Sequence, residues 1–312
     1  MSPSFQHRLE YWAARFLTGL IRLLPRQVGS LVGVILGQAV FSIVRLRREE
    51  TLDNLRHAFS SQRNERELVR IGACCYRNLG RGMTEFCRFT NLTQERLEEI
   101  LQIQGLEHIR NALGQGRGAI LLSAHFGVWE LLGPAFALNG FAVDLFVRTQ
   151  RNPLFDKLMS RHRRWVGAEI IRASRTPRGV VRSLRQNRLL VILADQDGGR
   201  DGIFVPFMGR DASTPRGVAR FAQETGAPVL MGFVVRWADG RYRLLIDPPM
   251  EVPDSGDREA DLLQILETYT RRLESYVREH PEQWFWPHRR WKTRPTSEGP
   301  MPYDEGDQSA GG

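Results

Sequence analysis

Residues 119–130 read Ala-Ile-Leu-Leu-Ser-Ala-His-Phe-Gly-Val-Trp-Glu, and this stretch decides the fold of the 312-residue chain. Its first six residues form a short apolar run of the length of a buried strand, and an amphipathic helical pattern begins at Trp129. His125 stands between the two. A strand that passes through a turn into a helix indicates an α/β fold, in which ligands bind at the carboxyl ends of the strands.

The rest of the chain extends this pattern in both directions. Helical spacing covers residues 45–105 and returns at 262–277, whereas four more apolar runs predict strands at 141–147, 189–194, 228–235 and 242–246. The last run follows an Ala-Asp-Gly turn and could be antiparallel. The sequence therefore predicts an α/β fold with a mixed, mostly parallel sheet wrapped by helices over residues 45–295. Residues 296–312 are polar and predict a disordered tail.

The first 44 residues differ in character from this main domain. Apolar residues recur at steps of three and four from Phe5 to Leu23 and predict one amphipathic helix that ends before Pro25. The uncharged run 28–44 follows, with glycines at 29, 33 and 37 that allow close helix packing. A buried helical hairpin is one interpretation. We favour membrane-associated helices, embedded in one leaflet rather than crossing it.

The positive charge of the chain is concentrated in one segment. The whole chain has 44 Lys and Arg against 35 Asp and Glu, a formal net charge of +9. Residues 148–188 hold 12 of the basic and 2 of the acidic residues, so the remainder is close to neutral. A concentrated basic surface favours an anionic partner, such as a phosphorylated substrate, an acidic protein, anionic lipid or nucleic acid.

The sequence offers little to hold a metal ion. The three cysteines, at positions 74, 75 and 87, have no metal-ligand spacing and do not suggest a disulfide framework. Asp195 and Asp197 could form a metal pair, but we favour hydrogen-bonding or loop-shaping roles for both. We expect no metal and no cofactor.

His125 and Glu130 are the candidate catalytic pair. They are five residues apart and could meet only if His125 lies in the turn and Glu130 in the first helical turn. The carboxylate would then orient the ring and raise the basicity of its other nitrogen, which makes His125 a general base. The alternative is a structural histidine and a glutamate that favours the helix dipole.

Several stretches carry a family resemblance. The His-x4-Glu spacing after a buried strand resembles the His-x4-Asp/Glu signature of glycerolipid acyltransferases. The whole pattern is similar to one branch of them, the late acyltransferases of lipid A biosynthesis. Stretches 54–59, 148–158, 194–199, 202–209 and 281–295 support the resemblance, and the last is the most specific: Pro-Glu-Gln-Trp-Phe-Trp-Pro-His-Arg-Arg-Trp-Lys-Thr-Arg-Pro.

The resemblance implies an acyltransferase domain with a glycerolipid-acyltransferase-like fold. The donor would be an acyl carrier protein thioester, and the acceptor a hydroxyl on a phosphorylated glycolipid precursor of lipid A. His125 would take the hydroxyl proton, and Glu130 would orient His125. The enzyme would act at the inner membrane surface, with its catalytic domain facing the cytoplasm.

Further residues are candidates for binding substrate. Arg148 and Arg163 match positions where the family keeps arginine, and could clamp phosphates or stabilise the oxyanion. Asp197, Arg289 and Arg290 are also predicted to contact substrate. The two arginines lie among three tryptophans, which indicates either a lipid-interface patch or the edge of the core.

Two other functions compete with this interpretation. One is an acyltransferase that acts on a lysophospholipid or another glycolipid and uses acyl-CoA. The other is a non-enzymatic basic protein that binds anionic membranes or nucleic acid. No nucleic-acid recognition motif is visible in the sequence, so we expect no nucleic-acid partner.

Overall fold

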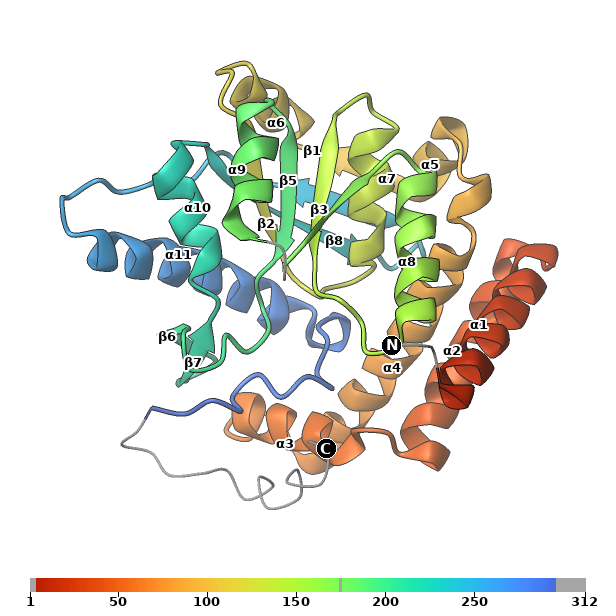
Figure 1. Ribbon diagram of the computed structural model, residues 1–312. Coiled ribbons are helices and arrows are strands. Elements are labelled where there is room, and N and C mark those ends of the chain that lie inside the picture. Colours follow the sequence, from red (N-terminus) through yellow and green to blue (C-terminus); the bar gives the residue numbers. More distant parts are fainter. Residues whose placement is uncertain (1–3, 174–175, 296–312) are drawn as a thin grey trace.

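The computed structural model describes residues 4–173 and 176–295, and a central sheet with helices on both faces organises them (Figure 1). The sheet has seven strands within these residues, in the order β1-β9-β8-β2-β5-β3-β4, and β6 and β7 form a separate antiparallel hairpin. The strands are β1 (Leu101–Gln104), β2 (Ala119–Ser123), β3 (Val143–Val147), β4 (Glu169–Arg172), β5 (Leu189–Leu193), β6 (Ile203–Phe207), β7 (Arg210–Thr214), β8 (Val229–Arg236) and β9 (Tyr242–Ile246).

The strand directions confirm a mixed, mostly parallel sheet. Strands β8, β2, β5, β3 and β4 run parallel, whereas β9 pairs antiparallel with β8 and carries β1 parallel to itself. The five predicted strands are all present. The sequence pattern missed β1, β4 and the β6–β7 hairpin. Strands β1 and β4 are four-residue edge strands, too short for an alternating pattern to be distinguished from a helical one.

Helices account for most of the remaining described chain. They are α1 (Phe5–Leu23), α2 (Arg26–Ala39), α3 (Arg48–Phe59), α4 (Glu65–Cys87), α5 (Gln94–Ile100), α6 (Leu106–Leu113), α7 (Leu132–Ala137), α8 (Pro153–Trp165), α9 (Thr176–Arg185), α10 (Gly217–Thr225) and α11 (Arg258–Glu279). A π-helical turn, η1 (Val40–Val44), continues α2, and short 3-10 helices occur at η2 (Phe89–Asn91), η3 (Trp129–Leu131) and η4 (Pro281–Gln283). The predicted tail, 296–312, lies outside the described residues.

Strand β2 divides the core into two layers. Every one of its residues is buried, and successive side chains point to opposite faces of the sheet. Ile120 and Leu122 join the cluster packed by α9, α10 and α11, whereas Ala119 and Leu121 join the one packed by α6 and α7. Because each fully buried aliphatic side chain stabilises the fold by roughly 1.5–3 kcal/mol, both layers hold β2 in register.

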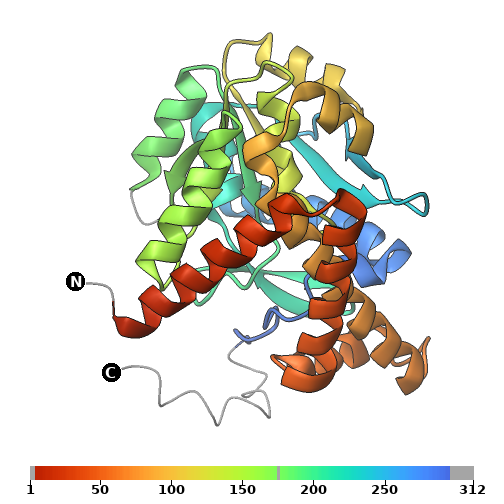
Figure 2. The ribbon, with the colours of Figure 1, turned by 90° about the vertical axis from the view of Figure 1, so that its right-hand side faces the viewer.

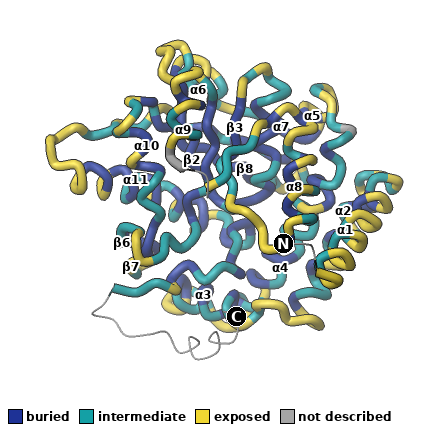
Figure 3. The backbone as a smooth tube through the Cα atoms, viewed as in Figure 1, coloured by how far each residue is buried: buried dark blue, intermediate teal, exposed yellow. Residues whose placement is uncertain are grey.

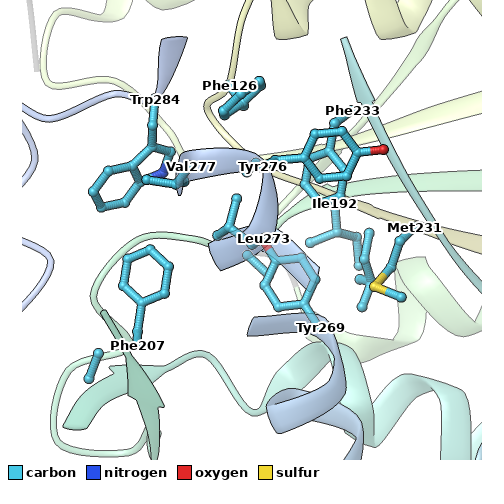
Figure 4. Packing of buried hydrophobic residues seen from close by; sticks show 14 of the residues in the cluster. Phe126, Ile192, Phe207, Met231, Phe233, Tyr269, Leu273, Tyr276, Val277 and Trp284 are labelled. Carbon is cyan, nitrogen blue, oxygen red and sulfur yellow. The ribbon is translucent and has the colours of Figure 1, made fainter. Parts of the chain in front are cut away.

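The aromatic C-terminal segment belongs to the core. Trp284, Trp286 and Trp291 are each 1% exposed or less. Figure 4 shows Trp284 above Phe207 of β6, and the two rings meet edge to face with centroids 5.2 Å apart. Of the two predicted interpretations of this segment, the core edge is therefore confirmed and the lipid-interface patch is wrong.

The N-terminal helices α1 and α2 lie against α4 and α8 at one side of the molecule (Figure 2). Their apolar side chains are largely exposed, and Figure 3 shows α1 mostly in the colour of exposed residues. Phe5 is 83% exposed and Phe16 75%. In the described part of the chain, one helical stretch, Arg26–Val44, is long and apolar enough to cross a membrane, with mean hydropathy 1.8.

One face of α2 nevertheless packs tightly on α4. A Cβ atom on Gly33 would come within 2.5 Å of the Gly80 carbonyl oxygen, and one on Gly37 within 2.1 Å of the Tyr76 oxygen. Backbone therefore meets backbone along this contact, as the glycine spacing predicts. The opposite face of α2 remains uncovered: Leu31 and Ile35 are each 58% exposed.

Candidate active site

The turn that follows β2, residues 124–128, presents His125 at the carboxyl edge of the sheet. Phe126 is buried beside Phe233 and Tyr276, and pairs with Trp284 in an antiparallel bridge (Figure 4). Gly127 has φ 57°, and a Cβ there would come within 1.8 Å of the Val234 carbonyl oxygen. Only glycine fits this close approach, so the turn holds His125 in one position.

The partner of His125 is Asp195, which follows β5. Its Oδ1 accepts a hydrogen bond from His125 Nδ1 at 2.8 Å, while its Oδ2 accepts from the His125 backbone N–H at 3.0 Å and from Trp284 Nε1 at 2.9 Å. Burial raises the pKa of Asp195, but the charge and hydrogen bonds of His125 and the Trp284 donor outweigh it and the net pKa is lowered. Asp195 is therefore an ionised carboxylate that fixes the proton on Nδ1 and leaves Nε2 as the basic nitrogen.

Glu130 does not orient His125 in this structure, which corrects the predicted contact. Its two carboxylate oxygens accept from Arg163 Nε at 3.0 Å and Nη2 at 2.6 Å. Burial lowers the pKa of Arg163, and the charge and hydrogen bonds of Glu130 more than offset this effect. The physical reason is where each carboxylate lies. The 3-10 helix η3 directs Glu130 towards α8, whereas β5, which is parallel to β2, places Asp195 beside the His125 ring.

A cavity of about 480 Å³ opens in front of His125. Arg148, Arg151 and Arg163 line it together with Trp129 and with residues that follow β5. Arg148 and Arg151 are exposed, and Arg163 retains Nη1 without a hydrogen-bond partner among the described residues. The cavity thus combines one base with several cationic donors, which suits an anionic or developing oxyanion group.

Three of the predicted substrate-binding residues lie elsewhere. Asp197 accepts from the Thr293 hydroxyl at 2.9 Å and from the Gly199 N–H, so it shapes its loop, the role we favoured over a metal pair. Arg290 is 1% exposed and donates to the Ser213 carbonyl and the Thr214 hydroxyl. Arg289 pairs with Glu50 of α3. None of the three lines the His125 cavity, because tertiary packing directs them into the protein.

Sequence reasoning missed Asp195 as the partner of His125. A signal was present: β2 and β5 are each followed by an alanine and then a polar residue, Ala124-His125 and Ala194-Asp195. Ser123 pairs with Leu193 in the parallel ladder, so the next residues fall side by side. Trp284 and Phe285 had no such local signal, since they reach the site from the far end of the chain. Phe285 N–H donates to the His125 carbonyl at 3.0 Å.

The geometry defines a class of protein, an α/β fold with a strand-end histidine that pairs with a buried carboxylate beside a cationic cavity. Comparison with known proteins agrees. Residues 1–293 match the family model described as bacterial lipid A biosynthesis acyltransferase. The chain belongs to this family and is an acyltransferase, so the non-enzymatic alternative is wrong.

Named relatives share most of this length. The chain is 28% identical to the lipid A biosynthesis palmitoleoyltransferase of Escherichia coli K12, over 96% of this chain and 97% of that protein. It is 27% identical to the lipid A biosynthesis lauroyltransferase of the same strain, over 94% and 96%. It is 30% identical to the phosphatidylinositol mannoside acyltransferase of Mycobacterium tuberculosis H37Rv, over 66% and 65%.

Proposed function

We propose that this enzyme transfers a fatty acyl chain from an acyl carrier protein thioester to a hydroxyl of a lipid A precursor, at the cytoplasmic face of the inner membrane. The observation that carries the proposal is the His125–Asp195 pair at the cationic cavity. The full-length similarity to two lipid A acyltransferases supports the acceptor class.

The chemistry follows from the position of His125. Nε2 accepts the proton of the acceptor hydroxyl while its oxygen attacks the thioester carbonyl carbon, and a C–O bond forms. The tetrahedral intermediate carries a negative oxygen, for which Arg163 Nη1 is the suitable donor in the cavity. When the C–S bond breaks, the sulfur leaves and takes the proton from the imidazolium. His125 is thereby regenerated, and no covalent enzyme intermediate is required.

An apolar groove of about 570 Å³ supports a substrate with fatty chains. It lies among α1, α2, α4 and α8, and its lining includes Leu36, Met83 and Leu158. Phe285 also lines it, and the ring of Phe285 is 6.0 Å from that of His125. The groove therefore leads from the exposed apolar helices towards the base, the direction in which a membrane-borne chain would enter.

The membrane location rests on α1 and α2. Exposed apolar side chains cover them both, and a soluble monomer does not usually expose a continuous patch of this kind. Deleting residues 1–24 should weaken membrane binding, although α2 remains, whereas high salt alone should not release the full chain. This deletion is cleaner than removal of residues 1–44, because Phe41 is 2% exposed and packs in the core.

The choice of donor rests on charge. Arg178, Arg182 and Arg185 are exposed on α9 and suit an acidic carrier protein. Other arginines of the basic segment form ion pairs within the protein, namely Arg163–Glu130, Arg172–Asp156 and Arg188–Asp144. Reversing the three exposed α9 arginines to Glu should weaken catalysis with acyl carrier protein and flatten its salt dependence. A small uncharged thioester should be unaffected, and reversal of Arg66 and Arg70 serves as the control.

A different glycolipid acceptor is the second candidate. The similarity to a phosphatidylinositol mannoside acyltransferase favours it, since this relative belongs to a separate acceptor class. The lysophospholipid acceptor and the acyl-CoA donor have no comparable support here.

One experiment tests the proposal directly. The gene is expressed in a host that lacks one late acylation step, and lipid A is measured by mass spectrometry. We expect a mass increase of one acyl group with the wild type and none with a His125 variant. An unchanged lipid A, together with acylation of a mannosylated phosphatidylinositol in vitro, would replace the first candidate by the second.

A further inference from the structure

A basic pocket of about 530 Å³ lies outside the His125 cavity. Val34 of α2 lines it, together with the α4 side chains Arg77 and Arg81 and the β8–β9 segment at Arg236 and Trp237. The apolar groove is lined by other sides of these same helices, at positions such as Gly37 of α2 and Gly80 of α4. At about 100° per residue Gly80 lies about 60° from Arg77 and 100° from Arg81 on α4, so the groove and the basic pocket lie on either side of the α2–α4 glycine contact.

The pocket has more positive charge than the protein neutralises. Arg77 donates to Cys74 Sγ at 2.7 Å and Arg81 to Asn78 Oδ1 at 3.0 Å. Within residues 4–173 and 176–295, no carboxylate pairs with Arg77, Arg81 or Arg236. Glu282 is the one acidic side chain in the lining.

The three guanidinium groups also affect one another. Each is partly buried, and burial lowers the pKa of Arg81, an effect that the positive charges of Arg236 and Arg77 increase. Partly buried cations that lack counter-ions favour an anion, and arginine binds phosphate through paired N–H donors. The pocket is therefore complementary to a phosphate group.

The surroundings of the pocket point to a phosphate carried by a lipid. Val34 belongs to the helical stretch that is apolar enough to cross a membrane, and its neighbours Leu31 and Ile35 are exposed. Trp237 lies at the other wall, 4.2 Å from the guanidinium carbon of Arg243. Figure 2 shows the β8–β9 hairpin projecting beside α2. Tryptophan and clustered arginine next to an apolar helix are typical of the headgroup layer.

We infer that this basic pocket binds the phosphate headgroup of an anionic glycerophospholipid in the membrane that carries the enzyme. The inference rests on the proposed membrane location and adds a lipid site distinct from both substrates. Such a contact would also orient the active site. Asn78 donates to the Glu282 carbonyl at 3.0 Å, and the Gly127 N–H donates to the Gln283 carbonyl at 2.8 Å, so the floor of the pocket continues into the His125 turn.

The test compares two double variants of α4. Arg77→Gln/Arg81→Gln removes two pocket charges, and Arg66→Gln/Arg70→Gln removes two exposed charges of the same helix near its other end, also four residues apart. Binding is measured to vesicles of phosphatidylcholine with and without phosphatidylglycerol. We expect the pocket variant to lose roughly 10- to 30-fold of the preference for phosphatidylglycerol. The control variant should keep that preference, and equal losses in the two variants would overturn the inference.

A second measurement separates the lipid from the acceptor as the source of phosphate. Acyl transfer is measured in neutral, phospholipid-free micelles, where both variants should match the wild type. A raised KM for the phosphorylated acceptor in the pocket variant alone would assign the pocket to the acceptor and overturn the phospholipid site. Vesicle binding decides the inference even if no acyl transfer is found, so the failures of the two proposals are distinguishable. Arg236→Gln on the opposite wall repeats the test if the double variant unfolds.

Discussion

The His125 turn and the α1–α2 helix pair depart from ordinary burial in opposite directions. At the turn, the charged carboxylate of Asp195 is buried at 2% exposure and accepts three hydrogen bonds from His125 and Trp284. In the helix pair, large apolar side chains such as Phe5 and Leu23 remain more than 80% exposed. Burying a charge and exposing apolar area both cost free energy, so each departure indicates a use.

Under the proposed function, the two regions therefore separate chemistry from anchoring. The polar network around His125 holds the imidazole in one tautomer and one position. The helix pair exposes apolar side chains and contributes no candidate catalytic residue. It packs on α4 through the glycine contact of α2, and the apolar groove lies between the helix pair and the rest of the protein. Variants in one region should leave the property of the other region unchanged, and the following predictions test this separation.

The largest expected effect comes from His125→Asn. This variant removes the base but keeps an N–H that can donate to Asp195, whereas alanine would also leave the buried carboxylate short of a donor. We expect acyl transfer to fall by about 10² to 10⁴. The free energy of unfolding and membrane binding should change little. His108→Asn on α6 is the control, and near wild-type activity of His125→Asn would contradict the mechanism.

The next effect distinguishes the two carboxylates. In Asp195→Asn, the two donors at Oδ2 hold the amide oxygen in that position, so the amide nitrogen faces His125 Nδ1 and imposes the wrong tautomer. Activity should fall roughly 10²- to 10⁴-fold. Glu130→Gln should cost less activity and instead lower the free energy of unfolding by about 1–3 kcal/mol, because it weakens a partly buried ion pair. A reversed order of activity losses, at equal stability, would restore Glu130 as the partner of His125.

A smaller effect is expected at the glycine contact of the helix pair. In Gly80→Ala, the new methyl group would come within 1.9 Å of the Gly33 carbonyl oxygen, so we expect a loss of about 1–3 kcal/mol in urea unfolding. Gly19→Ala meets nothing within 4 Å and should be neutral or stabilising. Activity per folded molecule should stay unchanged in both. Equal stabilities of the two variants would show that α2 does not pack closely on α4.

The smallest effect is a dependence of stability on pH. Burial lowers the pKa of His288 to about 3, and its Nε2 accepts the Asp197 N–H at 2.8 Å. The unfolded chain binds this proton near pH 6.5, so stability is full above that pH and falls by up to about 1.4 kcal/mol per unit as the pH drops below it. His288→Gln should flatten this slope in urea unfolding between pH 7 and pH 5. If the pH dependence of stability were unchanged in His288→Gln, His288 would not be its source.

Asp195 should not contribute to that loss. Its folded-state pKa is lowered, so the stability it provides is present above the unfolded value, near 3.9, and is lost only as the pH falls through the folded value. As the pH is lowered, the hydrogen bonds between Asp195 and His125 should therefore persist after the hydrogen bond between His288 and the Asp197 N–H is lost.

The sequence by itself determined the central strands of the sheet and identified His125 as the candidate base. The runs at 119–124 and 189–194 are apolar except for Ser123, and such runs are typical of the doubly covered centre of a parallel sheet. His125 was identifiable because it follows such a strand directly. The spacing of the glycines in α2 can also be read from a short stretch of sequence. It predicted close helix packing, which the contact of Gly33 and Gly37 with α4 confirms.

Tertiary structure alone decided which groups meet. Asp195 is 70 residues from His125 and Trp284 is 89 residues from Asp195, and hydrophobic periodicity says nothing about contacts at such separations. Whether Glu130 faced His125 or Arg163 depended on where α8 lies, and whether Arg290 met substrate or the Ser213 carbonyl depended on how the C-terminal segment folds back. Hydrogen bonds act over about 3 Å, so the partners of polar residues are set only when the whole chain has packed.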